Sequence, residues 1–400
     1  MTELSKIRVT GPLAPYVAGF RSHFVEIGYT ERSTRDATYV LAQLSRWLLA
    51  EGLAPVELTT GQLERFLAGR RAGRRRWSSI RSLRPMLDYL RSVGAVPPVD
   101  PPEMRPGEQL LVTYRGYLCI ERQLAPSTIR VNVDAARQFL SRCAIVDASG
   151  LAALEPADVT AFVVDEAHRR SVGSMKVLVS ALRSFLRFAF VTGLVARDLA
   201  PMVPTVAGWR LAGLPRAADA ATLAALLEHC DRGHLAGVRD YAVLTLLARL
   251  GLRAGEVAAL QFDDVDWSAG ELVVHGKAGR VDRLPLPDDV GETLVAYLTS
   301  ARPSSSCRAV FLRACAPVGP MSAKAVVMVP RNASRRAGVP VVGAHRLRHS
   351  AATEMLRGGA TLAEVAQVLR HASTDTTAIY AKVDRGALVH VVRPWPGCDR

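Results

Sequence analysis

Two proline clusters limit how this chain can fold. The run Pro97–Pro102 separates the first 96 residues from the rest, and Pro201, Pro204 and Pro215 mark a second break. Proline fixes φ and has no amide donor, so such clusters interrupt helices and form stiff linkers. A chain of 400 residues also exceeds one ordinary domain. We therefore expect three blocks, spanning residues 1–98, 103–202 and 216–400.

The first two blocks resemble one another at a spacing slightly under 100 residues. Ser33 opens an amphipathic run that reaches Leu48, and Ser127 opens another that reaches Phe139. In each run a Ser or Thr cap candidate precedes apolar residues at helical spacing. These patterns predict two long helices in corresponding positions.

Further correspondences follow along both blocks. The stretches 58–63 and 154–159 each indicate a helix start, and Gly94 and Gly193 each follow an apolar helical run as C-cap candidates. We expect two small modules of about four helices each, related by duplication. The alternative is that unrelated helical bundles share such patterns.

The third block changes character. After helical patterns at 219–230 and 238–250, residues 271–275 and 280–286 read as two strands joined by a Gly-Lys-Ala-Gly turn at 276–279. The patterns predict further helices at 288–300, 322–337, 345–357 and 361–370. The chain is thus predicted to be mainly α, with one small antiparallel sheet.

Charge favours a polyanionic partner. The net charge is +14, which suits phosphate contacts that release counterions, although an Arg-rich genome is the alternative cause. Five arginines gather between two predicted helices of the first block without a nearby acid, and we expect them to contact a phosphate backbone rather than form a merely solvated loop. Both modules have basic faces. The predicted phosphate-backbone contacts are Arg70, Arg71, Arg74, Arg75, Arg76 and Arg130.

Several classes of protein are disfavoured. The six cysteines lie far apart without a C-x-x-C pair, which fits a reducing cytosol and no zinc site, and Cys230 and His275 read as structural. The N-terminus has no signal-peptide pattern, and no run of about 18 apolar residues suggests a membrane span. We expect a soluble cytoplasmic protein associated with the nucleoid. His345 and His349 lack the intervening Glu of a zincin, so no metal is expected.

The last third of the chain carries groups that suit phosphodiester cleavage. This reaction needs a nucleophile, neutralisation of the non-bridging oxygens and a proton for the leaving oxygen. Tyr380 is the candidate nucleophile, and a phosphotyrosine intermediate would conserve the bond energy, so neither ATP nor another cofactor is needed. Arg253 and Arg348 offer planar forks of donors that suit phosphate oxygens.

The remaining groups supply protons. Lys277, on the predicted hairpin, could protonate the leaving 5′ oxygen, and His345 and His371 can exchange protons near neutral pH. His345 and Arg348 are three residues apart and so share one face of a helix. Taken together in order, six residues predict a phosphoryl-transfer site.

These residues resemble the tyrosine recombinase (phage integrase) family from about residue 216 to the C-terminus. The matching elements are Gly251-Leu252-Arg253 with Glu256, Lys277, His345-x-x-Arg348-His349, Leu369-Arg370-His371 and Tyr380. The resemblance implies that Arg253, Lys277, His345, Arg348 and His371 surround the scissile phosphate and that Tyr380 forms a 3′-phosphotyrosyl bond. It implies that Glu256 braces Arg253 and that His349 is a supporting residue.

The resemblance also implies an architecture. A SAM-like helical core-binding domain would occupy 103–202, and the catalytic fold would be like that of type IB topoisomerases. Members act on double-stranded DNA as tetramers through a Holliday junction. One departure is Arg370, where many members have Gly, which could add a phosphate contact or alter the local turn.

The leading hypothesis is a site-specific recombinase that integrates or excises a mobile element, acting alone or together with partner recombinases. The alternatives are a Xer-like resolvase, a topoisomerase-like relaxing enzyme and a non-catalytic architectural DNA-binding protein. The first module could bind arm-type sites or extend the clamp over the core site. An apolar stretch at Leu388–Val392 could dock on a neighbouring protomer or pack on its own domain.

Overall fold

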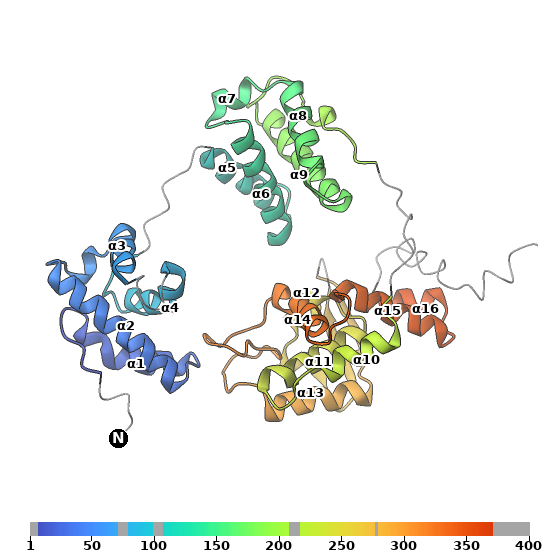
Figure 1. Ribbon diagram of the computed structural model, residues 1–400. Helices are drawn as coiled ribbons and strands as arrows, with labels where there is room; N and C mark the ends of the chain where they lie inside the picture. Colours follow the sequence, from blue (N-terminus) through green and yellow to red (C-terminus); the bar gives the residue numbers. More distant parts are fainter. Residues whose placement is uncertain (1–6, 71–78, 99–106, 208–216, 277–278, 371–400) are drawn as a thin grey trace, which may run out of the picture. The chain divides into compact units, whose positions relative to one another are not determined.

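The computed structural model describes residues 7–70, 79–98, 107–207, 217–276 and 279–370 (Figure 1). Its contacts divide the chain into one unit of residues 1–99 and 213–400 and another of residues 100–212. The described residues are mostly helical and contain one three-stranded antiparallel sheet, so the predicted fold class is confirmed.

The N-terminal part is a small helical bundle. Its core consists of aromatic and Leu side chains such as Phe20, Phe24 and Leu41, which are fully buried. Gly94 follows the last helix with a φ of +69°, as predicted for a C-cap. The helices are α1 (Val17–Glu26), α2 (Glu31–Ala50), α3 (Thr60–Arg70) and α4 (Ile80–Ser92), with short 3₁₀ turns at Ala14–Tyr16 and Pro55–Glu57.

The second unit is another helical bundle. Tyr114 lies fully buried at its centre against Phe185 and Phe188, and its hydroxyl donates to Ser184 Oγ at 2.9 Å. Gly193 ends the last helix with a φ of +72°. The helices are α5 (Glu108–Ile120), α6 (Pro126–Arg142), α7 (Ala148–Ala152), α8 (Pro156–Ala167) and α9 (Val172–Val191), followed by a 3₁₀ turn at Ala200–Met202.

Both predicted caps of the long helices were wrong. Helix α2 begins at Glu31, because Thr30 rather than Ser33 is the N-cap and its hydroxyl accepts from the amide of Ser33 at 3.2 Å. Helix α6 begins at Pro126, whose fixed φ suits the first helical position, and Ala125 is its N-cap without any side-chain bond. Ser127 lies inside the helix.

The C-terminal part contains the sheet. Strand β2 (Glu271–His275) pairs antiparallel with β3 (Val281–Pro285) and with β1 (Val265–Asp266), which the sequence patterns did not predict. The helices are α10 (Ala220–Glu228), α11 (Leu235–Arg249), α12 (Ala254–Ala259), α13 (Asp288–Ser300), α14 (Ala323–Arg336), α15 (Ala344–Arg357) and α16 (Leu362–Val368), and a 3₁₀ turn spans Phe262–Asp264. Helix α11 starts three residues before its predicted start at 238.

Helix α11 is the central element of this part. Every residue from Ala242 to Leu247 is buried, and the helix packs against α10, α13, α14 and α15. A helix that is apolar on all sides must be covered on all sides. The residues that follow its C-terminus are therefore held at a fixed position next to α15.

In the ranges that the structure describes, no helix combines the length and the apolar character needed to cross a membrane.

A substitution in α11 tests how closely its first turn packs. A Cβ on Gly237 would lie 1.8 Å from the carbonyl oxygen of Asp231, a backbone atom that cannot move aside cheaply. We expect Gly237→Ala to lower the free energy of unfolding by about 1–3 kcal/mol or more, measured by urea denaturation. In the control Gly291→Ala, on α13, the new methyl meets only Leu286 at 3.8 Å, and stability should be unchanged or rise by up to about 1 kcal/mol. Equal stability of the two variants would contradict this packing.

Candidate active site

The turn between α11 and α12 places Arg253. Gly251 has a φ of +59°, which strains residues with a side chain, and a Cβ there would lie 2.7 Å from Leu369 Cδ2. This glycine lets the chain reverse directly after the buried α11, so that Arg253 becomes the N-cap of α12. The turn therefore needs glycine for both its conformation and its close approach to Leu369.

Glu256 binds Arg253 twice. The backbone N–H of Arg253 donates to Glu256 Oε2 at 2.7 Å, and its Nη1 donates to Oε1 at 2.7 Å. Glu256 is buried, with 6% of its surface exposed, whereas the Arg253 side chain is 45% exposed. The carboxylate thus fixes one edge of the guanidinium and leaves another part at the surface, where a phosphate oxygen can approach.

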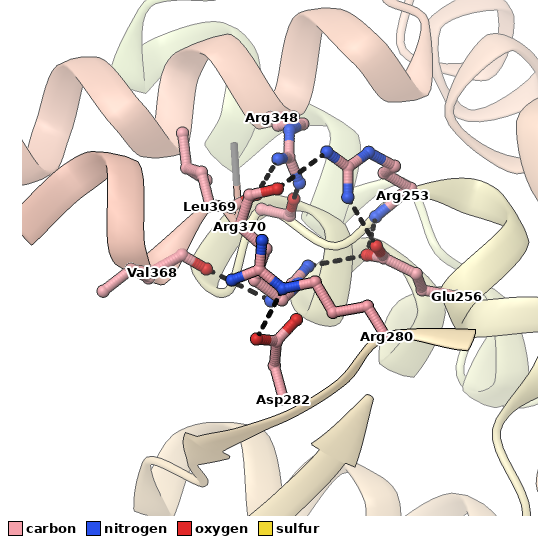
Figure 2. Close-up of polar contacts among 9 residues, drawn as sticks. Arg253, Glu256, Arg280, Asp282, Arg348, Val368, Leu369 and Arg370 are labelled. Atoms are coloured by element: carbon pink, nitrogen blue, oxygen red, sulfur yellow. Dashed lines mark hydrogen bonds and ion pairs between the residues drawn. The ribbon is translucent and has the colours of Figure 1, made fainter. Parts of the chain in front are cut away.

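Arg348, on α15, is buried and binds two backbone segments. Its Nη1 donates to the carbonyl of Gly251 at 2.6 Å, and its Nη2 donates to the carbonyl of Leu369 (Figure 2). Arg253 Nη2 donates to the next carbonyl, that of Arg370, at 3.2 Å. Arg253, the N-cap of α12, and Arg348, on α15, therefore converge on the backbone that immediately precedes residue 371.

Two histidines lie beside these arginines on α15. The rings of His345 and His349 meet edge to face, with centroids 4.4 Å apart. Burial, His345 and Arg348 lower the pKa of His349 to about 4, and burial, Arg348 and Arg253 lower the pKa of His345. Both imidazoles are therefore uncharged at neutral pH, and each can accept a proton or donate one N–H.

Hydrogen bonds fix the residues on either side of the predicted hairpin turn. The amide of Gly276 donates to the carbonyl of Arg280 at 2.7 Å, and His275 Nε2 lies 2.7 Å from Oδ1 of the buried Asp264. These contacts hold the start of the segment that carries Lys277.

The structure brings together Arg253, Glu256, His345, Arg348 and His349. Of the other predicted site residues, Arg130 is exposed on α6 in the second unit, and Arg70 is the last residue of α3. The remaining ones lie outside the described residues: Lys277, His371, Tyr380, Arg71, Arg74, Arg75 and Arg76.

Sequence reasoning missed a buried ion pair beneath this site. Arg370 Nη2 lies 2.6 Å from Glu256 Oε2, and neither side chain is more than 4% exposed. The departure of position 370 from Gly was visible in the sequence, but its partner lies 114 residues away. Figure 2 also shows Asp282, on β3, and Arg280, which immediately precedes β3, next to this pair.

A mainly helical domain in which two arginines converge on one loop, with two uncharged histidines beside them, defines a site suited to phosphoryl transfer. Residues 217–386 match the Phage integrase family, and residues 111–193 match the description "Phage integrase, N-terminal SAM-like domain". A protein named as an integrase/recombinase, y4rA of Sinorhizobium fredii, is 41% identical over 395 residues, covering 97% of this chain and 95% of its own length. The chain therefore belongs to the phage integrase family of tyrosine recombinases, enzymes that cleave and rejoin DNA.

Other relatives agree with this assignment. Tyrosine recombinase XerD of Mycobacterium tuberculosis is 32% identical over 305 residues, covering 71% of this chain and 95% of its own length. A crystal structure of a lambda integrase dimer bound to a COC′ core site matches with a TM-score of 0.55 at 16% identity, covering 73% of this chain and 98% of that one. A lambda integrase tetramer bound to a Holliday junction matches with a TM-score of 0.53 at 15% identity, covering 66% and 77%. These structures share the fold.

The low pKa of His349 has a consequence for stability. Because the folded-state pKa, about 4, is below the usual 6.5, the folded protein takes up this proton later than the unfolded chain as the pH falls. Stability from the neutral ring is fully present above about pH 6.5 and declines as the pH falls toward 4. We expect the free energy of unfolding to fall less between pH 7 and pH 5 in His349→Gln than in the wild type, measured by urea denaturation at each pH.

The control for this titration is His229→Gln, since His229 is exposed at the end of α10. This variant should retain the wild-type pH dependence. If His349→Gln also retains it, His349 does not titrate as described.

Proposed function

We propose that this recombinase integrates or excises a mobile element through a 3′-phosphotyrosyl intermediate formed by Tyr380. The observation that carries the proposal is the convergence of Arg253 and Arg348 on the backbone that leads into residue 371. Phosphoryl transfer depends mainly on positioning and on neutralising charge at the non-bridging oxygens. Two fixed guanidiniums at one loop provide such an environment.

In the proposed reaction, the Tyr380 oxygen attacks phosphorus and the 5′ oxygen leaves. Lys277 supplies the proton that this leaving oxygen needs, and the tyrosine proton passes to His345, which is neutral, or to His371. The lowered pKa of His345 supports this acceptor role, because its ring is unprotonated before the reaction. One phosphoester replaces another, so a 5′ hydroxyl from a second strand can reverse the step without ATP. Arg253, whose side chain is 45% exposed, would bind a non-bridging oxygen. Arg348 is buried and donates to the carbonyls of Gly251 and Leu369, so it would add positive charge near the phosphate and hold the loops in place.

The domain boundaries 1–98, 103–202 and 216–400 remain our proposal. They are supported by separate hydrophobic clusters around Phe20, Phe185 and Leu246, and by the family matches at 111–193 and 217–386. We also propose that the first two modules arose by duplication.

The share of the chain that each relative covers supports the mobile-element role over that of a Xer-like resolvase. XerD covers 71% of this chain and leaves part of it without a counterpart, whereas y4rA covers 97%. We propose that the additional helical module contacts DNA beyond the core site, with the arginine run at 70–76 on the phosphate backbone.

We further propose that four protomers assemble on two DNA sites, where partner recombinases can take part, and that the protein resides with the nucleoid. The lambda integrase tetramer on a Holliday junction, which shares this fold, supports the assembly. Strand exchange needs four cleavages, two on each duplex, and each protomer has one candidate nucleophile.

Covalent capture tests the nucleophile. The full-length protein is incubated with a pool of nicked duplexes of random sequence, in which cleavage near the nick releases a short strand and traps the adduct. Wild-type protein should form a phosphotyrosyl adduct and so select its own site, whereas Tyr380→Phe should form none, as read by denaturing electrophoresis. Tyr241→Phe, which removes another hydroxyl from the same domain, should form the adduct. An adduct that survives Tyr380→Phe would refute the assignment.

The selected site then separates recombination from relaxation. Exchange between two plasmids that each carry the site supports a recombinase of mobile DNA. Relaxation of plasmids that lack the site, without exchange between those that carry it, would instead support a topoisomerase-like enzyme.

The arginine run should determine part of the salt dependence of DNA binding. Each phosphate contact contributes about 0.9 to the slope of log K against log salt concentration. We expect replacement of Arg70, Arg71, Arg74, Arg75 and Arg76 by Gln to reduce this slope by up to about 4.5, measured by fluorescence anisotropy.

The control replaces arginines that already have an acidic partner: Arg249, Arg308 and Arg357. Their substitution by Gln should change the slope less per residue. An unchanged slope after replacement of the run would show that these arginines do not contact DNA.

A further inference from the structure

Arg370 is a buried arginine in an unusual backbone conformation. Its φ is +54°, a region that favours glycine, yet only 4% of the residue surface is exposed. Among the described residues other than glycine, Gln123 and Ala144 also have positive φ, but both are exposed. Such a conformation persists only where the surroundings hold it in place.

The guanidinium of Arg370 binds inside the protein rather than at its surface. Nη2 pairs with Glu256 Oε2 at 2.6 Å, and Nη1 donates to the carbonyl of Val368 at 3.1 Å. The Arg370 side chain is only 2% exposed, so it does not offer a donor to a DNA phosphate. Of the two roles suggested by the sequence, an added phosphate contact is disfavoured.

The pair with Glu256 reaches Arg253. The same carboxylate accepts from the backbone N–H and the Nη1 of Arg253. Glu256 therefore carries one negative charge between two guanidiniums, and the group has a net charge of +1. A buried carboxylate that loses one of these partners must take up a proton or draw the other guanidinium closer.

A third element lies beside this group. Arg370 Nε and Asp282 Oδ2 are both buried and have no hydrogen-bond partner in the described part of the chain. Burial lowers the pKa of Arg370, while Glu256 and Asp282 act in the opposite direction, so the Asp282 carboxylate is near enough to act on it. Figure 2 shows Asp282 on β3 beneath Arg370, with its Oδ1 bound to Arg280 Nε at 3.0 Å.

We infer that Arg370 is a positioning residue for DNA cleavage, which holds Glu256 and thereby sets the place and charge of Arg253. It also ties the backbone before residue 371 to α12, and Asp282 places β3 against the same guanidinium. This inference rests on the proposed function, because it assigns Arg370 to the cleavage step. Arg370 acts through Arg253 and not on the DNA itself.

Two variants separate the guanidinium from the backbone conformation. Arg370→Gly removes the guanidinium and relieves the positive φ, whereas Arg370→Ala removes the guanidinium and keeps the strain. We expect both to slow single-turnover cleavage of the duplex selected by the wild-type protein by on the order of 10–100-fold, with DNA affinity reduced much less. Arg370→Lys, which keeps the charge and one donor toward Glu256, should recover part of the rate. An Arg370→Gly variant as fast as wild type would overturn the inference.

A double-mutant comparison tests whether Arg370 acts through Arg253. In an Arg253→Ala background, Arg370→Gly should cause no further loss of cleavage rate. If the two losses multiply instead, Arg370 acts independently of Arg253, and the inference fails. The matched control, Arg249→Ala, removes an exposed arginine paired with Asp289 at the end of α11 and should leave the cleavage rate unchanged.

A substrate with a neutral scissile group separates a loss of charge stabilisation from a general folding defect, because a folding defect would slow cleavage of both substrates equally. A methylphosphonate at the scissile position lacks the charge that Arg253 would neutralise. The ratio of wild-type to Arg370→Gly cleavage rates should therefore be several-fold smaller on this substrate than on the ordinary phosphate. An equal ratio on both substrates would indicate a merely structural role and would overturn the inference.

Amide exchange tests the same link without any DNA. In Arg370→Gly, peptides covering residues 252–257 should exchange faster, because the N–H of Arg253 donates to Glu256; in Arg249→Ala they should be unchanged. Unchanged exchange in Arg370→Gly would overturn the link, whatever the DNA assays show. Absence of a wild-type adduct would refute the proposed function alone, since the exchange experiment does not depend on it.

Discussion

The candidate site depends on one buried guanidinium. Arg348 reaches from α15 to the carbonyls of Gly251 and Leu369, which belong to loops 97 and 21 residues away in the sequence. A buried arginine has to satisfy its donors, and backbone carbonyls in loops have to find partners. The Arg348 guanidinium and these two carbonyls satisfy one another's hydrogen bonds. The loop before α12 and the loop after α16 are therefore held next to each other. Arg253 and residue 370 obtain their positions from this contact.

Different residues of the site supply positive charge and transfer protons. An arginine side chain keeps its charge at any physiological pH, so the positive charge that two arginines bring to this site is constant. The same charge, together with burial, keeps His345 and His349 neutral. Groups that stabilise charge and groups that can move protons therefore lie side by side without competing for the same role.

Much of the fold could be predicted because it is encoded locally. The helices and hairpin of the C-terminal part follow from periodicity, and Gly94 and Gly193 take the positive φ expected of C-caps. The start of α2 was misplaced because Thr30 and Ser33 are both good caps, and only the folded chain shows which one accepts the bond. Strand β1 has two residues, too few for any alternation to be visible.

The contacts within the site were harder to predict, because they join residues far apart in the chain. The sequence placed Arg253, Arg348 and Glu256 in one site by resemblance, but the burial of Arg348 and its binding to carbonyls carry no local signal. From the sequence, Arg370 could add a phosphate contact or alter the local turn, since nothing near it in the chain shows that its partner is Glu256. Long-range burial of a charge cannot be read from periodicity.

The separate hydrophobic clusters have an evolutionary consequence. A substitution near Phe20 or Phe185 changes packing that does not include Leu246, so its energetic cost is confined to one cluster. The helical modules can therefore accumulate changes while selection preserves the arrangement around Arg348. A lineage of such enzymes can acquire new genomic destinations and inherit its bond-breaking machinery unaltered.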